Sequence, residues 1–197
     1  MYLEKINGPE DVKKLTVKEM STLAEEMRTA LLKRASIHGG HFGPNFGMVE
    51  ATIALHYVFE SPKDKIVYDV SHQTYPHKML TGRKDAYLYE EHYDDVSGYS
   101  NPHESEHDHF IIGHTSTSVS LACGLAKARD LNGEKGNVIG VKEDVTSESY
   151  KQKPKSKLDN SQFAFCVKNS GNCPVCLFFP EWSAFVGCAV SGIFWTE

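Results

Sequence analysis

The chain of 197 residues has no long apolar run and no block of basic residues. No stretch reaches the ~18 apolar residues of a membrane-spanning helix, and residues 1–10 are polar and acidic, unlike a signal peptide. The net charge of −5 is mild and does not favour nucleic acid or an anionic membrane as a partner. We therefore expect a cytoplasmic protein that binds neither nucleic acid nor membrane.

Cysteine is scarce and unevenly placed. Cys123 lies alone, and the other four are Cys166, Cys173, Cys176 and Cys188. The odd number and the expected reducing compartment argue against a disulfide framework. The four late cysteines could form a zinc site, but only one close pair is present, so free thiols are the simpler interpretation.

Apolar periodicity predicts two helices in the first third of the chain. Thr16 and Glu19 have the spacing of a capping box, and apolar residues then recur at helical spacing as far as about Ser36. Gly39 follows and favours a helix stop or a ligand loop. A second helix, with little polar surface, is predicted from Met48 to Phe59.

Short apolar runs predict three strands, at Lys65–Val70, His109–Ile112 and Asn137–Val141. A helix over Thr117–Asp130, with Leu121, Leu125 and Ala128 on one face, lies between the last two. The polar stretch from Tyr87 to His109 is interpreted as a surface or lid loop. Together these elements predict a three-layer α/β fold, incomplete, with a mostly parallel sheet between helices.

The composition and the apolar periodicity of the sequence change after Val141. Residues 142–158 alternate charged side chains with Ser and Thr, and residues 160–197 contain both tryptophans and most of the cysteines without a clear period. We divide the chain into a domain over residues 1–141 and a divergent linker with an irregular tail over residues 142–197.

All ten histidines lie between His38 and His114, which indicates one half of an active site. His41 follows two glycines, His72 follows the first predicted strand, and His114 precedes a run of Ser and Thr. Ligands of open α/β sheets gather at the carboxyl ends of the strands, which is where His72 is expected.

The order of four motifs resembles the opening of the 1-deoxy-D-xylulose-5-phosphate synthase family. The motifs are Gly39–Phe42, Glu50–Phe59, Asp69–Arg83 and Gly113–Ser118. The resemblance covers about residues 1–141, and four ordered motifs are far more specific than any single one.

The resemblance implies a transketolase-like enzyme that uses thiamine diphosphate and Mg²⁺. Such an enzyme, a homodimer, condenses pyruvate with glyceraldehyde 3-phosphate and releases carbon dioxide, which supplies isoprenoid, thiamine and pyridoxal synthesis. By position, His41 is the catalytic residue beside the reacting carbon, and the cofactor is bound by His72, Gly113, His114 and Thr115.

The chemistry of these residues agrees with the implied roles. Imidazole titrates near neutrality, so His41 can relay protons. Gly113 admits close approach of a ligand, and Thr115–Ser118 place hydroxyl and N–H groups at a helix start, which favours a diphosphate.

Each of these features also has a structural interpretation. A histidine at a strand end is often a hydrogen-bonding residue of the structure, and His56 and His77 are assigned to that class. The Ser-Thr-Ser run could be a simple N-cap. The histidines at 103, 107 and 109 lie among acidic residues and could mimic a metal site, but such a stretch is usually solvated.

One motif of the family is altered here. Where the family has Gly-Asp-Gly, this chain has Glu143, Asp144 and Val145. Asp144 falls at the Mg²⁺-ligand position, but Glu143 adds negative charge beside a diphosphate and Val145 adds a β-branched side chain. We expect weak cofactor binding. The family's second module, with the Glu that activates thiamine, has no counterpart in these 197 residues, so we expect no synthase activity from this chain alone.

Three hypotheses remain open at this point. The chain is a truncated or rearranged synthase fragment, a non-catalytic interaction or regulatory protein derived from that module, or one subunit of a split thiamine-dependent enzyme. The third needs an intact Gly-Asp-Gly site, which the substitutions at 143 and 145 disfavour.

Overall fold

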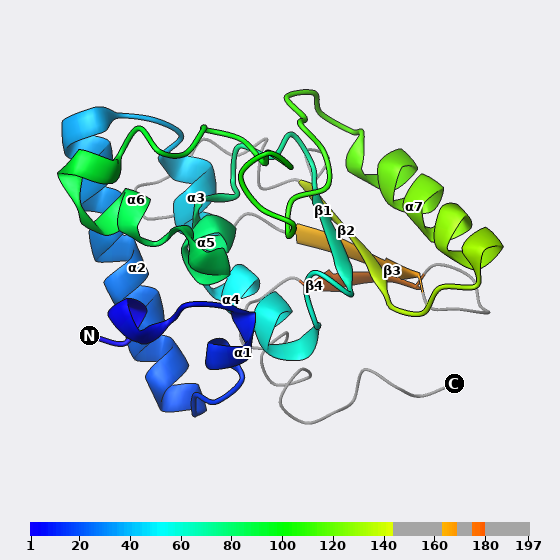
Figure 1. Ribbon diagram of the computed structural model, residues 1–197, viewed down its shortest axis with the longest axis horizontal. Helices are drawn as coiled ribbons and strands as arrows, with labels where there is room; N and C mark the ends of the chain where they lie inside the picture. Colours follow the sequence, from blue (N-terminus) through cyan, green and yellow to red (C-terminus); the bar gives the residue numbers. More distant parts are fainter. Residues whose placement is uncertain (144–162, 169–174, 180–197) are drawn as a thin grey trace.

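The computed structural model describes residues 1–143, 163–168 and 175–179 (Figure 1). The helices are α1 (Pro9–Val12), α2 (Val17–His38), α3 (Gly43–Gly47), α4 (Val49–Val58), α5 (Tyr75–Lys78), α6 (Asp85–Leu88) and α7 (Ser118–Asn132). Short helical turns of other types are η1 (Leu3–Lys5), η2 (Met79–Arg83) and η3 (Glu90–His92). The strands are β1 (Lys65–Tyr68), β2 (Val138–Glu143), β3 (Phe163–Lys168) and β4 (Val175–Phe179).

The predicted capping box starts the longest helix, α2. The Glu19 N–H donates to the Thr16 hydroxyl, and the Glu19 carboxylate accepts the Thr16 N–H at 2.8 Å. The buried face of α2 includes Leu23, Met27 and Leu31, which enter one core cluster with residues of α4 and α5. The helix ends at His38, two residues after the predicted end near Ser36, and the predicted stop residue Gly39 follows with φ +80°.

The sheet has the order β1-β2-β3-β4. The strand predicted to end at Val141 pairs in parallel with β1, with Lys65 opposite Val138, as a parallel α/β sheet requires. By contrast, β2–β3 and β3–β4 are antiparallel. No regular element was predicted for the segments that form β3 and β4, because their apolar residues have no clear period.

Helices pack on both faces of the β1–β2 pair, because successive side chains of a strand point to opposite faces. Ile66 and Tyr68 lie in one core cluster with residues of α4. Val67 lies in another with α7. On the α7 face, a Cβ at Gly140 would lie 3.3 Å from that of Ala122, so the missing side chain allows the helix to lie close to the strand.

The predicted helix after residue 117 is present, but its buried face differs from the expected one. Ala122, Ala126 and Arg129 are buried, whereas Leu121 and Leu125 are only partly buried and Ala128 is exposed. Small residues face the sheet because the helix lies close to it.

The strand predicted at His109–Ile112 is wrong, since this segment has no regular structure. Ile112 instead covers the α7 face of β1 and β2, in the cluster with Val67 and Val138, while Ile111 is 67% exposed. Three apolar residues are too short a pattern to distinguish a strand from a loop that covers a sheet face.

The segment Tyr87–His109, predicted as a surface or lid loop, is mostly exposed or partly buried, but four of its residues reach the interior. Tyr87, Tyr93, Ser100 and Asp108 are buried, and the segment contains parts of α6 and η3. Polar residues reach the interior here because they pair with one another and with backbone groups.

Two predictions, the metal ligand and the zinc site near the end of the chain, concern residues that the structure does not fully describe. Asp144, Cys173 and Cys188 lie outside the described residues, and of Cys166 and Cys176 the structure describes only the backbone, in β3 and β4. Within the described part, no helix combines the length and apolar character that a membrane crossing requires.

Candidate functional site

The carboxyl end of β1 is joined to the start of α7 by Asp69. This side chain is buried, with 2% of the residue exposed, and its carboxylate accepts the N–H groups of Ser116, Thr117 and Ser118 at 3.0, 3.0 and 3.2 Å. Asp69 therefore caps α7 from another element, and its charge is favourable at a helix N-terminus.

The two residues after Asp69 adopt the left-handed conformation. Val70 has φ +59° and Ser71 has φ +66°, which is rare for a β-branched residue and costs energy. The Ser71 hydroxyl donates to the Ile112 carbonyl at 2.8 Å and accepts the Ser100 N–H at 3.2 Å. These bonds hold the turn and tie it to the segment that leads to Gly113.

A second connection is made by Asn45, which is fully buried. Its Nδ2 donates to the His41 carbonyl at 2.5 Å and to the His72 carbonyl at 2.8 Å. Its Oδ1 accepts the Tyr75 N–H at 2.9 Å. One side chain thereby holds together the loop after α2 and the turn after β1.

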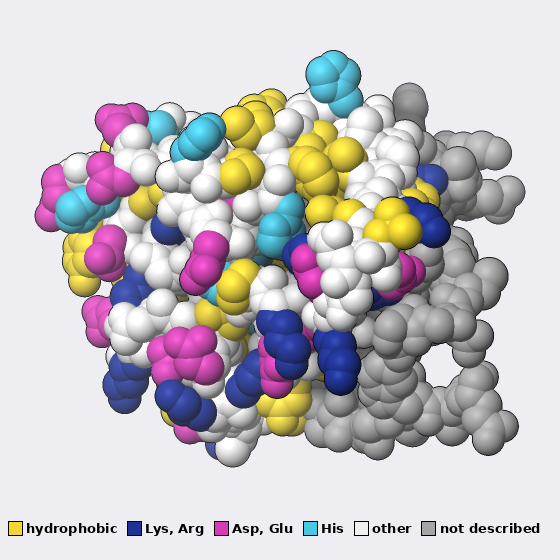
Figure 2. All heavy atoms as spheres, turned by 45° about the vertical axis from the view of Figure 1, so that its right-hand side comes forward, with side chains coloured by type: hydrophobic (Ala, Val, Ile, Leu, Met, Phe, Trp, Pro, Cys, Tyr) yellow, Lys and Arg dark blue, Asp and Glu magenta, His cyan; other side chains and the backbone are white. Residues whose placement is uncertain are grey.

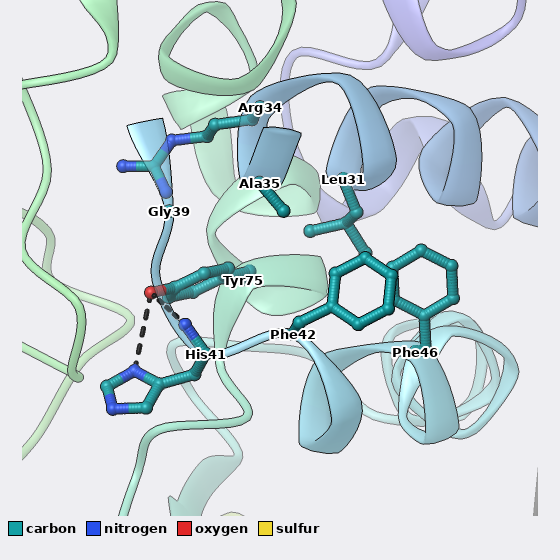
Figure 3. A pocket seen from close by; sticks show the side chains of 8 residues that line it. All are labelled: Leu31, Arg34, Ala35, Gly39, His41, Phe42, Phe46 and Tyr75. Atoms are coloured by element: carbon teal, nitrogen blue, oxygen red, sulfur yellow. Dashed lines mark hydrogen bonds between the residues drawn. The ribbon is translucent and has the colours of Figure 1, made fainter. Parts of the chain in front are cut away.

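These connections bring His41 and His72 side by side. Their ring centroids are 5.4 Å apart at an interplanar angle of 82°. The ring of Tyr99 lies 5.0 Å from that of His41. Nδ1 of His41 lies 3.3 Å from the Tyr75 hydroxyl oxygen, which also accepts the His41 backbone N–H at 3.2 Å (Figure 3).

A pocket beside His41 lies between the end of α2 and α3. Its wall includes Arg34, Phe42 and Phe46, and the two phenylalanine rings lie side by side in Figure 3, tilted by 35° with their centroids 4.3 Å apart. Arg34 is 4% exposed and donates to the carbonyls of Ala86 and Tyr93. The pocket places an apolar wall next to the predicted catalytic histidine.

The loop Gly113–Thr115 lies at the same end of the sheet as His72, at the top of Figure 1. All three of its residues are exposed, and a side chain at Gly113 would meet nothing within 4 Å. In Figure 2, histidine and hydrophobic side chains lie in the upper middle of the face shown, whereas acidic side chains lie at its upper left and charged side chains of both signs lie in its lower part. Five residues predicted from the sequence thus lie at one edge: His41, His72, Gly113, His114 and Thr115.

The expectation that N–H groups at the start of α7 are available to a diphosphate is wrong for residues 116–118. Asp69 already accepts all three of these N–H groups. The Thr117 hydroxyl is likewise used, donating to the His114 carbonyl at 2.9 Å. The exposed residues 113–115 are still able to contact a ligand.

A buried hydrogen-bonded chain contains the two histidines assigned to the structure. His77 Nε2 lies 3.0 Å from the Asp108 carboxylate, and His77 Nδ1 lies 2.9 Å from His56 Nε2. Burial lowers the pKa of His56 well below its ordinary value, and the charge of His77 adds to the shift. Burial also lowers the pKa of His77 and outweighs the opposing hydrogen bond from Asp108. Both rings are therefore neutral at pH 7.

Four charged residues complete this interior network. Arg83 donates to both oxygens of Asp108 at 2.8 and 2.9 Å, and Lys78 donates to Glu104 at 2.6 Å. Burial opposes ionisation of Asp108, but the bonds from Arg83 and His77 outweigh it and lower its pKa. The two cations and two anions balance, which allows a polar segment to be buried.

No group of three possible metal ligands occurs among the residues that the structure describes. His107 instead lies 2.9 Å from the Ser61 hydroxyl, and burial lowers the pKa of His109 to about 4. His103 is exposed. Of the acidic residues between them, Glu104 and Asp108 face Lys78 and Arg83.

Sequence reasoning missed Asn45, Tyr75 and Asp69 as organisers of this edge. Asp69 and Tyr75 lie within the quoted motif around His72, and Asn45 lies in the glycine-rich loop after His41. No local pattern marks them, because each has a partner that is 27 to 49 residues away in the sequence.

The fold and this edge define an α/β protein with a candidate ligand site at the carboxyl end of a parallel strand. The chain belongs to the 1-deoxy-D-xylulose-5-phosphate synthase family, whose model matches residues 3–148. The family resemblance of the four ordered motifs is thereby confirmed.

Curated relatives share about half of the aligned residues. The 1-deoxy-D-xylulose-5-phosphate synthase of Dictyoglomus turgidum is 50% identical over 141 residues, which are 72% of this chain and 23% of that protein. That of Thermomicrobium roseum is 51% identical over 142 residues, with 72% and 23% covered. That of Alkaliphilus oremlandii is 53% identical over 140 residues, with 71% and 22% covered. The chain thus spans less than a quarter of the length of these relatives.

Proposed function

We propose that residues 1–141 form part of the diphosphate-binding module of a transketolase-like 1-deoxy-D-xylulose-5-phosphate synthase. The observation that carries this proposal is the juxtaposition of His41 and His72, 5.4 Å apart, at the same sheet edge as the loop Gly113–Thr115. The family match over residues 3–148 supports it. In the whole enzyme, a cytoplasmic homodimer, the substrates are pyruvate and glyceraldehyde 3-phosphate.

The residues present fit the diphosphate end of thiamine diphosphate. Exposed His114 and Thr115 can donate hydrogen bonds, and open space beside Gly113 admits a ligand. The negative charge of Asp69 at the start of α7 is unfavourable for the phosphates, so they are held by residues 113–115 and His72 and not by the helix end. When bound, the cofactor supplies the carbanion chemistry that joins the two substrates.

His41 holds a proton at its Nε2 atom. Nδ1 faces Tyr75, so Nε2 is the ring nitrogen left to face a ligand. From that position an imidazole can donate a hydrogen bond to an oxygen of the ligand. The apolar wall of Phe42 and Phe46 limits water on one side of the histidine.

The metal part of the proposal depends on Asp144, which follows β2 in the sequence. Glu143, the last residue of β2, replaces a family glycine, and so does Val145. We propose that Asp144 contributes to Mg²⁺ binding and that its two neighbours weaken cofactor binding by charge and bulk. Synthase activity requires residues of the relatives that lie outside the region aligned with this chain, which is less than a quarter of their length. We therefore expect this chain alone to be inactive.

A titration of the ¹⁵N-labelled chain with thiamine diphosphate and Mg²⁺, followed by NMR, tests the cofactor site. We expect saturable shifts of His41, His72 and residues 113–115, no such shifts with thiamine, and at least tenfold weaker binding of His114→Gln. His103→Asn, at another exposed histidine, is the matched control. Shifts confined to other residues, or none, would overturn the proposed site.

Restoring the family glycines tests the account of weak binding. The double variant Glu143→Gly/Val145→Gly is expected to bind thiamine diphosphate with Mg²⁺ at least tenfold more tightly, because it removes the charge and the branched side chain. Unchanged affinity contradicts that account. Detectable product from pyruvate and glyceraldehyde 3-phosphate with the unmodified chain contradicts the prediction of inactivity.

A further inference from the structure

We propose that Tyr75 is a positioning residue that fixes His41 as the neutral tautomer with its proton on Nε2. The proposed function gives His41 its role, and the present proposal deepens it by naming the residue that decides which ring nitrogen donates. It rests on the hydrogen bonds at one hydroxyl group.

The Tyr75 hydroxyl makes two contacts, both with His41. The His41 backbone N–H donates to its oxygen at 3.2 Å, and Nδ1 of the same residue lies 3.3 Å away (Figure 3). A phenol has one proton to donate. No other acceptor for that proton is present in the described part of the chain, so the arrangement that satisfies every group has the hydroxyl donate to Nδ1.

The alternative ring states each leave a group unsatisfied. With the proton on Nδ1, the Tyr75 oxygen would accept two hydrogen bonds and its own proton would lack an acceptor. With the ring turned over, a carbon atom would face the hydroxyl. Because a phenol that is almost fully buried is stabilised by a partner, and Tyr75 is 5% exposed, both states are disfavoured.

Tyr75 is itself held in place from three sides. Asn45 accepts its backbone N–H at 2.9 Å, the Arg34 guanidinium lies 5.4 Å from its ring centroid, and the Tyr87 ring centroid lies at 5.5 Å. Since Asn45 also binds the His41 carbonyl, the histidine backbone and the hydroxyl are fixed relative to each other. The imidazole must therefore adapt to the tyrosine.

Gly40 permits this close approach. A Cβ at this position would lie 2.8 Å from the Tyr75 hydroxyl oxygen, and the residue has φ +113°, which side chains disfavour. Gly40 therefore does more than allow the loop its unusual backbone conformation. Because it has no side chain, the Tyr75 hydroxyl can lie next to the backbone of the loop.

The consequence is a neutral histidine that donates from Nε2. An imidazole held in this way offers a hydrogen bond to a substrate oxygen without first being charged, and its basic nitrogen is occupied by Tyr75. The rings of His72 and Tyr99, at 5.4 and 5.0 Å, pack against the imidazole and oppose its rotation.

Long-range ¹H–¹⁵N correlation spectra of the histidine-labelled chain, recorded above the titration range of imidazole, read the tautomer directly. We expect His41 to have its proton on Nε2 and its Nδ1 resonance displaced by an accepted hydrogen bond. A proton on Nδ1 in the unmodified chain overturns the proposal. This measurement needs no variant and no cofactor, so it is independent of whether thiamine diphosphate binds.

Tyr75→Phe removes only the hydroxyl group. We expect its His41 Nδ1 resonance to move to the position of an unbonded ring nitrogen, and its His41 backbone amide to exchange roughly two- to tenfold faster, as loss of one hydrogen bond implies. Tyr99→Phe, whose ring also contacts His41, should leave both unchanged. An unchanged Nδ1 resonance in Tyr75→Phe, with the rest of the spectrum intact, overturns the proposal.

Discussion

Nε2 of His56 lies 2.9 Å from Nδ1 of His77 in the protein core, and the two rings are stacked with their centroids 5.0 Å apart. The ionised carboxylate of Asp108 accepts from His77 Nε2, so His77 Nδ1 is an acceptor and His56 donates to it. The pair therefore forms a directed chain of hydrogen bonds that requires His77 to be neutral, because a protonated Nδ1 could not accept from His56.

Acid should destabilise the fold through this pair at a pH above the range in which carboxylates titrate. The pKa of both histidines is lowered by burial, whereas in the unfolded chain they titrate near the ordinary value of about 6.5. Their contribution is therefore complete above about pH 6.5 and declines as the pH falls, by at most ~1.4 kcal/mol per pH unit for each ring. Urea unfolding at several pH values between 7.5 and 5.5 measures this slope.

The slope should decrease in His56→Gln, which removes one of the titrating groups. His103→Asn, at an exposed position, should leave it unchanged. Equal slopes in the unmodified chain and in His56→Gln would show that the buried pair does not cause the acid sensitivity.

Removing the charge of Asp108 should be among the most destabilising single changes. Asp108→Asn leaves His77 without its anionic partner and leaves Arg83 with only the longer contact to Glu104, at 3.3 Å, and breaking a buried pair on one side costs about 3–5 kcal/mol. Asp94→Asn is the matched control, because that side chain is 94% exposed and bonded only to His38. Chemical unfolding compares the two; similar free energies for both variants would refute a structural role for the network.

Loss of the Asp69 carboxylate should loosen the start of α7 more than it lowers global stability. Asp69→Asn keeps the shape but cannot accept N–H groups with both oxygens, and the loss of an N-cap costs about 1 kcal/mol. Amide hydrogen exchange of Ser116, Thr117 and Ser118 should become faster, roughly fivefold for that free energy. Asp95→Asn, which is exposed and bonded to His92, should not change these amides. Protection that persists in Asp69→Asn would contradict the capping role.

Asn45→Ala should separate the two histidine loops. The variant leaves two carbonyls and one N–H group without partners in a buried place, at a cost of about 1–3 kcal/mol for each buried group left unsatisfied. We expect a lower unfolding free energy together with loss of the nuclear Overhauser contacts between the rings of His41 and His72. Asn132→Ala, at the exposed end of α7, controls for removal of an amide. Contacts that persist between the rings would rule out Asn45 as the clamp.

Local patterns were sufficient for the elements that have a clear period. The capping box of Thr16 and Glu19, the apolar helix α4 and the first strand were all predicted, because side-chain spacing along one element determines which face can be buried. The strand predicted at His109–Ile112 was wrong because a three-residue run has no period. The buried residues of the polar segment up to His109 were not predicted, because its ion pairs connect residues 25 and 26 positions apart.

The sequence by itself determined the main helices, the parallel pair of strands and, through the order of its motifs, the family. Only the tertiary structure decided that Asp69 occupies the N–H groups of α7, that Asn45 joins the loops of His41 and His72, and that Tyr75 faces His41 Nδ1. These contacts are hydrogen bonds between residues distant in the chain. They depend on how the loops close around the end of β1, which spacing along the sequence does not specify.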